Sequence, residues 1–194
     1  LATKHNAVLV FDECTSGFRR TLGGLHLHYG VEPDLATFGK TLGNGYAVTA
    51  VIGRASVMEA AQTTFISSTF WTERIGAAAG LAAISTMREE DAPARVHDIG
   101  ERVQARWREI ADRTGFAITT GGLPALANFT PVERNPLEVK TFVTSRMLGC
   151  GFLASNSLYA SVAHTDEILS EHFGVTARLN SGAPDTGSMR SGTK

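Results

Sequence analysis

Two charged residues, at the ends of two short apolar runs, could bind a ligand or take part in catalysis. Asp12 follows the run 7–11, and Lys40 follows Gly39 after the run 35–38. Such runs are typical of strands buried in a parallel sheet, and open α/β sheets bind ligands beyond the carboxyl ends of these strands. A carboxylate at that position could contact a ligand, and a desolvated lysine could bind a phosphate or act as a nucleophilic Schiff-base amine. The competing interpretations are a turn acid and an exposed loop lysine.

Gly39-Lys40-Thr41 shares its three residues with the end of a P-loop, but that motif needs a glycine where Asp34 stands. The carboxylate, the amine and the glycines after Lys40 fit a site for pyridoxal 5'-phosphate (PLP) better. PLP needs an amine that holds its aldehyde as an imine, and a carboxylate that keeps its pyridine nitrogen protonated. Lys40 and Asp12 together therefore predict a PLP site.

The rest of the chain predicts the elements that must position these two residues. Short apolar runs at 7–11, 35–38 and 47–52 predict strands, since glycine-rich turns separate them. From residue 73 onward apolar residues recur every three or four positions, which predicts helices over 74–90 and 93–114. The remaining pattern predicts strands at 116–119, 126–130 and 157–162, and helices over 138–148 and from an N-cap at Thr165. The predicted fold class is α/β, continued by an α+β region.

The composition limits the classes of function. The 194-residue chain has 43% hydrophobic and 19% charged residues, and its net charge of -1 offers no basic excess for nucleic acid. No apolar run approaches the roughly 18 to 20 residues that span a bilayer. Cys14 and Cys150 are far apart, which favours a reducing, cytoplasmic compartment. His26 and His28 have no third metal ligand nearby, so loop or surface histidines are favoured over a metal site.

Three segments carry a resemblance to a known family, namely VFDECTSGFR at 10–19, YGVEPDL at 29–35 and FGKTLGNGY at 38–46. They resemble the class III PLP-dependent aminotransferases, and within them the glutamate-1-semialdehyde aminomutase-like group. Three later segments agree with this family in order and spacing, namely Ser68-Thr69-Phe70, the alanine-rich run 77–80 and AHTDE at 163–167. The resemblance implies a fragment of a fold type I PLP-dependent transferase: the end of the large, mainly parallel-sheet domain and the α+β small domain.

The resemblance also implies roles for individual residues. Asp12 would pair with the pyridine nitrogen, and Lys40 would form the Schiff base and later move a proton at the substrate carbon. Cys14 stands where the family has an aliphatic residue against the ring face, so its thiol would pack there. Thr69, with Ser68, would bind the phosphate, and in this family Thr69 does so across a homodimer interface.

A domain organisation follows from the same resemblance. The large domain would end near residue 87, the small domain would occupy 88–174, and 175–194 would form a loose tail. The family's glycine-rich phosphate cup and its stacking aromatic residue precede the region that this chain matches. We therefore expect Leu1 to correspond to an internal position of the family.

The implied activity is transfer of an amino group from a small-molecule donor to a carbonyl acceptor, by a homodimer without nucleic-acid or membrane partners. Two alternatives stay open: intramolecular transfer of the aminomutase type, and a truncated chain without catalytic activity. The bulky run 70–74 differs from the small residues usual in the aminomutase and disfavours that reaction. Arg146 and Arg178 are candidates for binding a substrate carboxylate.

Overall fold

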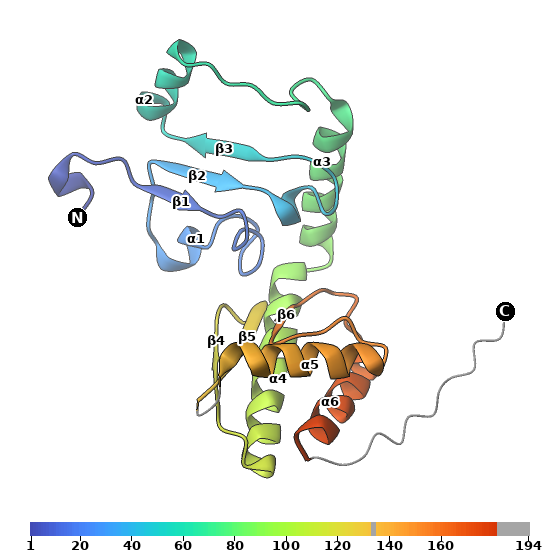
Figure 1. Cartoon of the computed structure of the whole chain (residues 1–194). Helices are drawn as coiled ribbons and strands as arrows, with labels where there is room; N and C mark the ends of the chain where they lie inside the picture. The colour runs from blue at the N-terminus through green and yellow to red at the C-terminus, as the bar shows by residue number, and fades with distance from the viewer. Residues whose placement is uncertain (133–134, 182–194) are drawn as a thin grey trace. The chain divides into compact units, whose positions relative to one another are not determined.

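The computed structural model describes residues 1–132 and 135–181, and the chain divides into two compact units, Leu1–Arg95 and Val96–Lys194 (Figure 1). The elements up to residue 95 are η1 (Thr3–His5), β1 (Val10–Asp12), α1 (His26–Tyr29), β2 (Leu35–Phe38), η2 (Lys40–Leu42), β3 (Ala50–Gly53), α2 (Ala55–Met58), η3 (Glu59–Thr63), α3 (Arg74–Glu89) and the start of α4 (Ala92–Thr114). Those that follow are β4 (Ile118–Gly121), β5 (Leu126–Pro131), α5 (Pro136–Gly149), β6 (Ser157–Tyr159) and α6 (Asp166–Ser181).

No helix in the described ranges is long and apolar enough to cross a membrane. The domain boundary expected near residue 87 stays a prediction.

The first unit is built on a three-stranded sheet in the order β1-β2-β3. β1 pairs with β2 in parallel, with Asp12 opposite Thr37, whereas β2 and β3 are antiparallel. Burial alternates along β2 because successive side chains point to opposite faces, and its Ala36 and Phe38 join a buried cluster with Phe18 and Met87. β2 has the predicted bounds, while β1 and β3 each begin three residues later than the sequence predicts.

β1 is less buried than its apolar sequence predicts. Val10 is 50% exposed and Asp12 lies at the surface, so the expected burial on both faces is wrong for this chain. The reason is the place of β1 in the sheet, since it is an edge strand with β2 as its one neighbour among the described residues.

α3 packs closely against the segment before β3 because a glycine faces that segment. A Cβ on Gly76 would lie 2.7 Å from the carbonyl oxygen of Ala47, closer than real Cβ contacts come. The helix begins where the carboxylate of Glu73 accepts the backbone N–H groups of Ile75 (2.9 Å) and Gly76 (3.1 Å). Gly76 therefore allows the helix to approach this segment closely.

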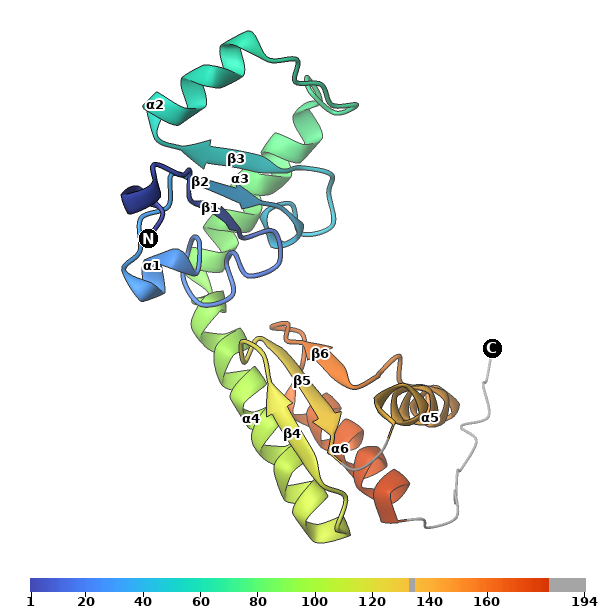
Figure 2. The same ribbon diagram turned by 60° about the vertical axis from the view of Figure 1, so that its left-hand side comes forward.

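The second unit packs α4 and α6 against another three-stranded sheet, in the order β4-β5-β6 with antiparallel pairs (Figure 2). Its core contains Val103 and Trp107 of α4, Phe129 of β5 and Leu169 of α6. The rings of Trp107 and Phe129 meet edge to face with their centroids 5.1 Å apart. This unit has the α+β architecture that the sequence predicts.

α6 confirms one capping prediction and corrects the predicted tail. The backbone N–H of Ile168 donates to Thr165 Oγ1 (3.4 Å), so Thr165 caps the helix as expected. The helix continues to Ser181, although the sequence predicts a loose tail from residue 175. Val175 is only 6% exposed, and its burial stabilises the added turns. The rest of the predicted tail, 182–194, lies outside the described residues.

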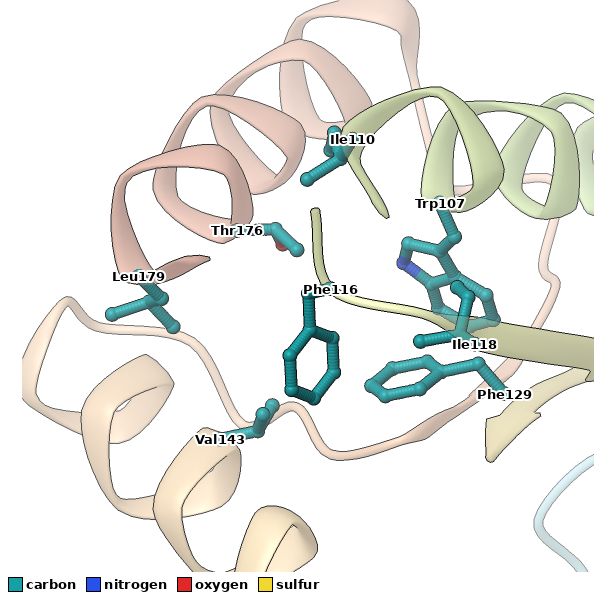
Figure 3. Close-up of a pocket in the computed structure, with 8 residues that line it drawn as sticks. All are labelled: Trp107, Ile110, Phe116, Ile118, Phe129, Val143, Thr176 and Leu179. Carbon is teal, nitrogen blue, oxygen red and sulfur yellow. The ribbon is translucent and has the colours of Figure 1, made fainter. Parts of the chain in front are cut away.

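A pocket in the second unit is too small for an organic substrate (Figure 3). Its lining is mostly apolar and comprises Trp107, Ile110, Phe116, Ile118, Phe129, Val143, Thr176 and Leu179. The volume is ≈ 20 Å³, enough for a single water molecule, and the Thr176 hydroxyl already donates to the carbonyl of His172 (2.9 Å). The residues predicted to carry the chemistry, Asp12 and Lys40, belong to the first unit.

Candidate functional site

Asp12 is the last residue of β1, and its carboxylate is held ionised by its immediate neighbours. Oδ1 accepts the backbone N–H of Cys14 (3.0 Å) and the hydroxyl of Thr37 (3.1 Å). These hydrogen bonds, the Cys14 N–H first, lower the pKa of Asp12 below its ordinary value of 3.8, and the charge of Lys40 lowers the pKa a little further. Both of these hydrogen bonds reach Oδ1, and the carboxylate is exposed, so it can accept a further proton donor.

Lys40 occupies a strained backbone position two residues after β2. Its φ is +44°, in the left-handed region that residues other than glycine seldom adopt and that is found at functional sites. The backbone N–H of Asn44 donates to the Lys40 carbonyl (3.0 Å) and helps hold this conformation. The side chain is exposed, and Nζ donates a hydrogen bond to Thr15 Oγ1.

The parallel pairing of β1 and β2 brings these two residues to the same end of the sheet, where both strands finish. Asp12 lies opposite Thr37 in the register, and Lys40 follows three residues after Thr37. Both side chains therefore lie beyond the carboxyl ends of their strands, where open α/β sheets bind ligands.

Cys14 lies within this group of residues. Its thiol is half-buried, 3.9 Å from Thr37 Oγ1, and a Cβ added to Gly39 would come to 3.5 Å from Sγ. The space between the thiol and Gly39 therefore has room for about one methyl group. Packing of Cys14 against a cofactor ring stays a prediction.

Ser68 and Thr69 are not joined to the other predicted residues by any contact that the described part of the chain shows. Both are exposed and lie in the loop between η3 and α3, where Ser68 Oγ accepts the backbone N–H of Phe70 (3.3 Å). Their predicted role in binding a phosphate stays a prediction.

Thr15 and Thr37 are site residues that the sequence interpretation missed. Thr15 accepts a hydrogen bond from Lys40, and Thr37 donates one to Asp12. Thr37 could have been found, since pairing of the predicted strands 7–11 and 35–38 in parallel register places it beside Asp12. Nothing in the sequence pattern distinguishes Thr15 from other loop hydroxyls.

The residues present fit PLP. Asp12 offers an ionised carboxylate with an accessible oxygen for a protonated ring nitrogen, and Lys40 offers an exposed amine for an aldehyde. The arrangement can therefore bind an aldehyde cofactor and move a proton at Lys40 Nζ.

Comparison with known proteins agrees with this geometry. A family model described as "Aminotransferase class-III" matches residues 1–153. A curated 3-aminobutyryl-CoA aminotransferase of Cloacimonas acidaminovorans (strain Evry) is 34% identical over 135 residues, which cover 67% of this chain and 32% of the relative. A glutamate-1-semialdehyde 2,1-aminomutase of Neisseria meningitidis is 31% identical over 196 residues, which cover 92% of this chain and 46% of the relative.

Solved structures share the fold. The FumI protein of Sphingopyxis sp. MTA144, in its PLP internal aldimine form, superposes with a TM-score of 0.87 at 24% identity, over 93% of this chain and 44% of that one. A phospholyase from Arthrobacter, in complex with phosphoethanolamine, gives a TM-score of 0.79 at 26% identity, over 94% of this chain and 47% of that one. The predicted fold class, a fragment of a fold type I PLP-dependent transferase, is therefore confirmed. The chain spans less than half the length of these relatives.

Replacing Thr37 by valine tests the account of the Asp12 carboxylate. The variant keeps the shape of the side chain and removes one hydrogen-bond donor to Oδ1, so we expect the pKa of Asp12 to rise toward its ordinary value of 3.8. A carboxyl NMR titration of the PLP-free protein measures this pKa. The matched control is Thr63→Val, whose hydroxyl donates to the Ala60 carbonyl in η3. An Asp12 pKa that stays unchanged or falls in Thr37→Val would contradict the account.

Proposed function

The chain belongs to the class III aminotransferase family, and we propose on that basis that the protein is a PLP-dependent aminotransferase. It moves an amino group from a small-molecule donor to a carbonyl acceptor, in the cytoplasm. The observation that carries the proposal is the parallel pairing of β1 and β2, which brings the ionised carboxylate of Asp12 and the amine of Lys40 to one edge. A curated aminotransferase among the relatives and PLP in a solved neighbour support the same activity and cofactor.

Bound PLP would supply an aldehyde and a protonated ring that takes up negative charge from the substrate carbon. Asp12 remains ionised at neutral pH, and its carboxylate would accept a hydrogen bond from the protonated ring nitrogen. Lys40 Nζ would hold the aldehyde end and, as a free amine, remove and return the proton at the substrate carbon. Thr15 Oγ1 accepts an N–H of Lys40 and so restricts where the amine can lie.

The proposal extends to the loop between η3 and α3 and to a homodimer. Ser68 and Thr69 of this loop would bind the phosphate of PLP held by a second copy of the chain, while Cys14 would pack against the ring. The support is the surface around them, where Phe65 is 93% exposed and Trp71 is 67% exposed. Large exposed apolar side chains on one loop are typical of association surfaces.

Intramolecular amino transfer is the second candidate, and the match to an aminomutase over nearly the whole chain favours it. The two reactions differ in what leaves the protein. A transaminase releases an oxo acid after its first half-reaction, whereas a mutase returns the same carbon skeleton. In a single turnover of the PLP-loaded protein with an amino donor and no acceptor, we expect one oxo acid per site. Isomerised substrate without released oxo acid would assign the mutase reaction instead.

Replacing Lys40 tests the aminotransferase proposal directly. We expect Lys40→Ala to abolish the visible absorption band of bound PLP and to lower the transfer rate at least about a hundredfold, because the amine and its proton transfer are lost. Lys40→Arg should fail similarly, since a guanidinium keeps the charge and stays protonated. The control is Lys4→Ala, an exposed lysine in η1. Full activity in Lys40→Ala would overturn the proposal.

A further inference from the structure

Glu13, the residue after Asp12, is an acid buried at 2% exposure that the proposed chemistry does not use. Oε2 accepts the hydroxyl of Ser16, and Oε1 accepts the backbone N–H of His26 (3.0 Å) and lies 3.1 Å from its ring Nδ1. Burial raises the pKa of Glu13, but the bonds from Ser16 and from the backbone of Leu25 and His26 outweigh burial and lower the pKa below its ordinary value. The carboxylate is therefore charged, buried and well supplied with donors.

The backbone around Glu13 is shaped to make room for this carboxylate. A Cβ on Gly24 would lie 2.2 Å from the Nδ1 of His26 and 2.8 Å from Oε1 of Glu13. A Cβ on Gly17 would lie 2.8 Å from the Glu13 carbonyl oxygen. A side chain at Gly24 would therefore have to displace the network itself, whereas one at Gly17 would press on the backbone of Glu13 and on the ring of Phe38.

The same carboxylate closes the loop that carries the partners of the site. The loop starts at Glu13, whose N–H donates to the carbonyl of Thr37 (2.9 Å), and it ends at His26, which Glu13 holds by its side chain. Between these points lie Cys14, whose N–H donates to Asp12, and Thr15, which accepts from Lys40. Movement of the Glu13 side chain would therefore be transmitted to the contacts of both charged residues.

We propose that Glu13 is a positioning residue of the cofactor site, whose buried carboxylate holds the 13–26 loop and with it the groups that contact Asp12 and Lys40. This inference rests on the proposed function for its meaning, because the loop serves a PLP site only if the protein binds PLP. Glu13 acts through the loop and does not touch cofactor or substrate. Loss of its acceptors leaves backbone N–H groups of the loop buried without partners, which favours local opening.

Hydrogen exchange of the PLP-free full-length protein, read by mass spectrometry, provides a measurement that needs no activity. We expect Glu13→Ala to speed exchange in peptides covering 14–26 by about tenfold or more. Glu13→Gln, which keeps the shape and an acceptor oxygen, should restore most of the protection. Gly24→Ala places a methyl group against the same network, so it should also speed exchange in peptides covering 14–26. The matched control is Glu73→Ala, which also removes a carboxylate that accepts two backbone N–H groups in the same unit.

A second measurement links the loop to the site. In the PLP-loaded protein, the pH midpoint of the visible absorption band should shift in Glu13→Ala and Gly24→Ala, return toward wild type in Glu13→Gln, and stay at wild type in Glu73→Ala. An unchanged exchange rate over 14–26 in Glu13→Ala would overturn the inference. It would also be overturned if exchange became faster in Glu13→Ala while the pH midpoint of the absorption band stayed at its wild-type value. Absence of any band in wild type would contradict the proposed function and, with it, the assignment of Glu13 to a cofactor site. A fast-exchanging loop in Glu13→Ala would then show a folding role alone.

Discussion

The parallel pairing of β1 with β2 is the constraint on which the whole site depends. Asp12 and Lys40 are separated by 28 positions in the chain, and they lie at the same end of the sheet because the two strands point the same way. In an antiparallel pair the carboxyl ends of the two strands would lie at opposite ends of the sheet. The register then sets the details, since Asp12 opposite Thr37 puts a hydroxyl beside the carboxylate and the amine three residues further on.

The ionisation of Asp12 depends little on the charge of the Lys40 amine. The Cys14 N–H and the Thr37 hydroxyl contribute most to the low pKa of Asp12, and the charge of Lys40 contributes least. Asp12 therefore remains ionised whether or not Lys40 is protonated or covalently occupied. The strained φ of Lys40 and the buried network around Glu13 show that the backbone is held in place around this pair.

The sequence predicted the parts of this fold that follow from apolar pattern and missed those that depend on neighbours. β2 has its predicted bounds because the strand coincides with the apolar run 35–38, whereas β1 is exposed because burial depends on what lies beside an edge strand. Asp12 and Lys40 were found from their places after apolar runs. Thr15 and Glu13 were not, since the partner of a loop hydroxyl and the burial of a second acid leave no periodic signal. Thr69 shows no contact with Asp12 or Lys40 in the described part of the chain, and its role across a homodimer interface stays a prediction.

Reduction of the PLP-loaded protein with borohydride tests the central claim most directly. The reagent fixes PLP on the amine that holds it, and peptide mapping by mass spectrometry then identifies that amine. The account predicts the adduct on Lys40, at one per chain, and its loss in Asp12→Ala, where the ring nitrogen has no partner. An adduct on Lys4, Lys140 or Lys194, or reduced PLP spread over several lysines, would contradict the assignment of this edge of the sheet as the active site.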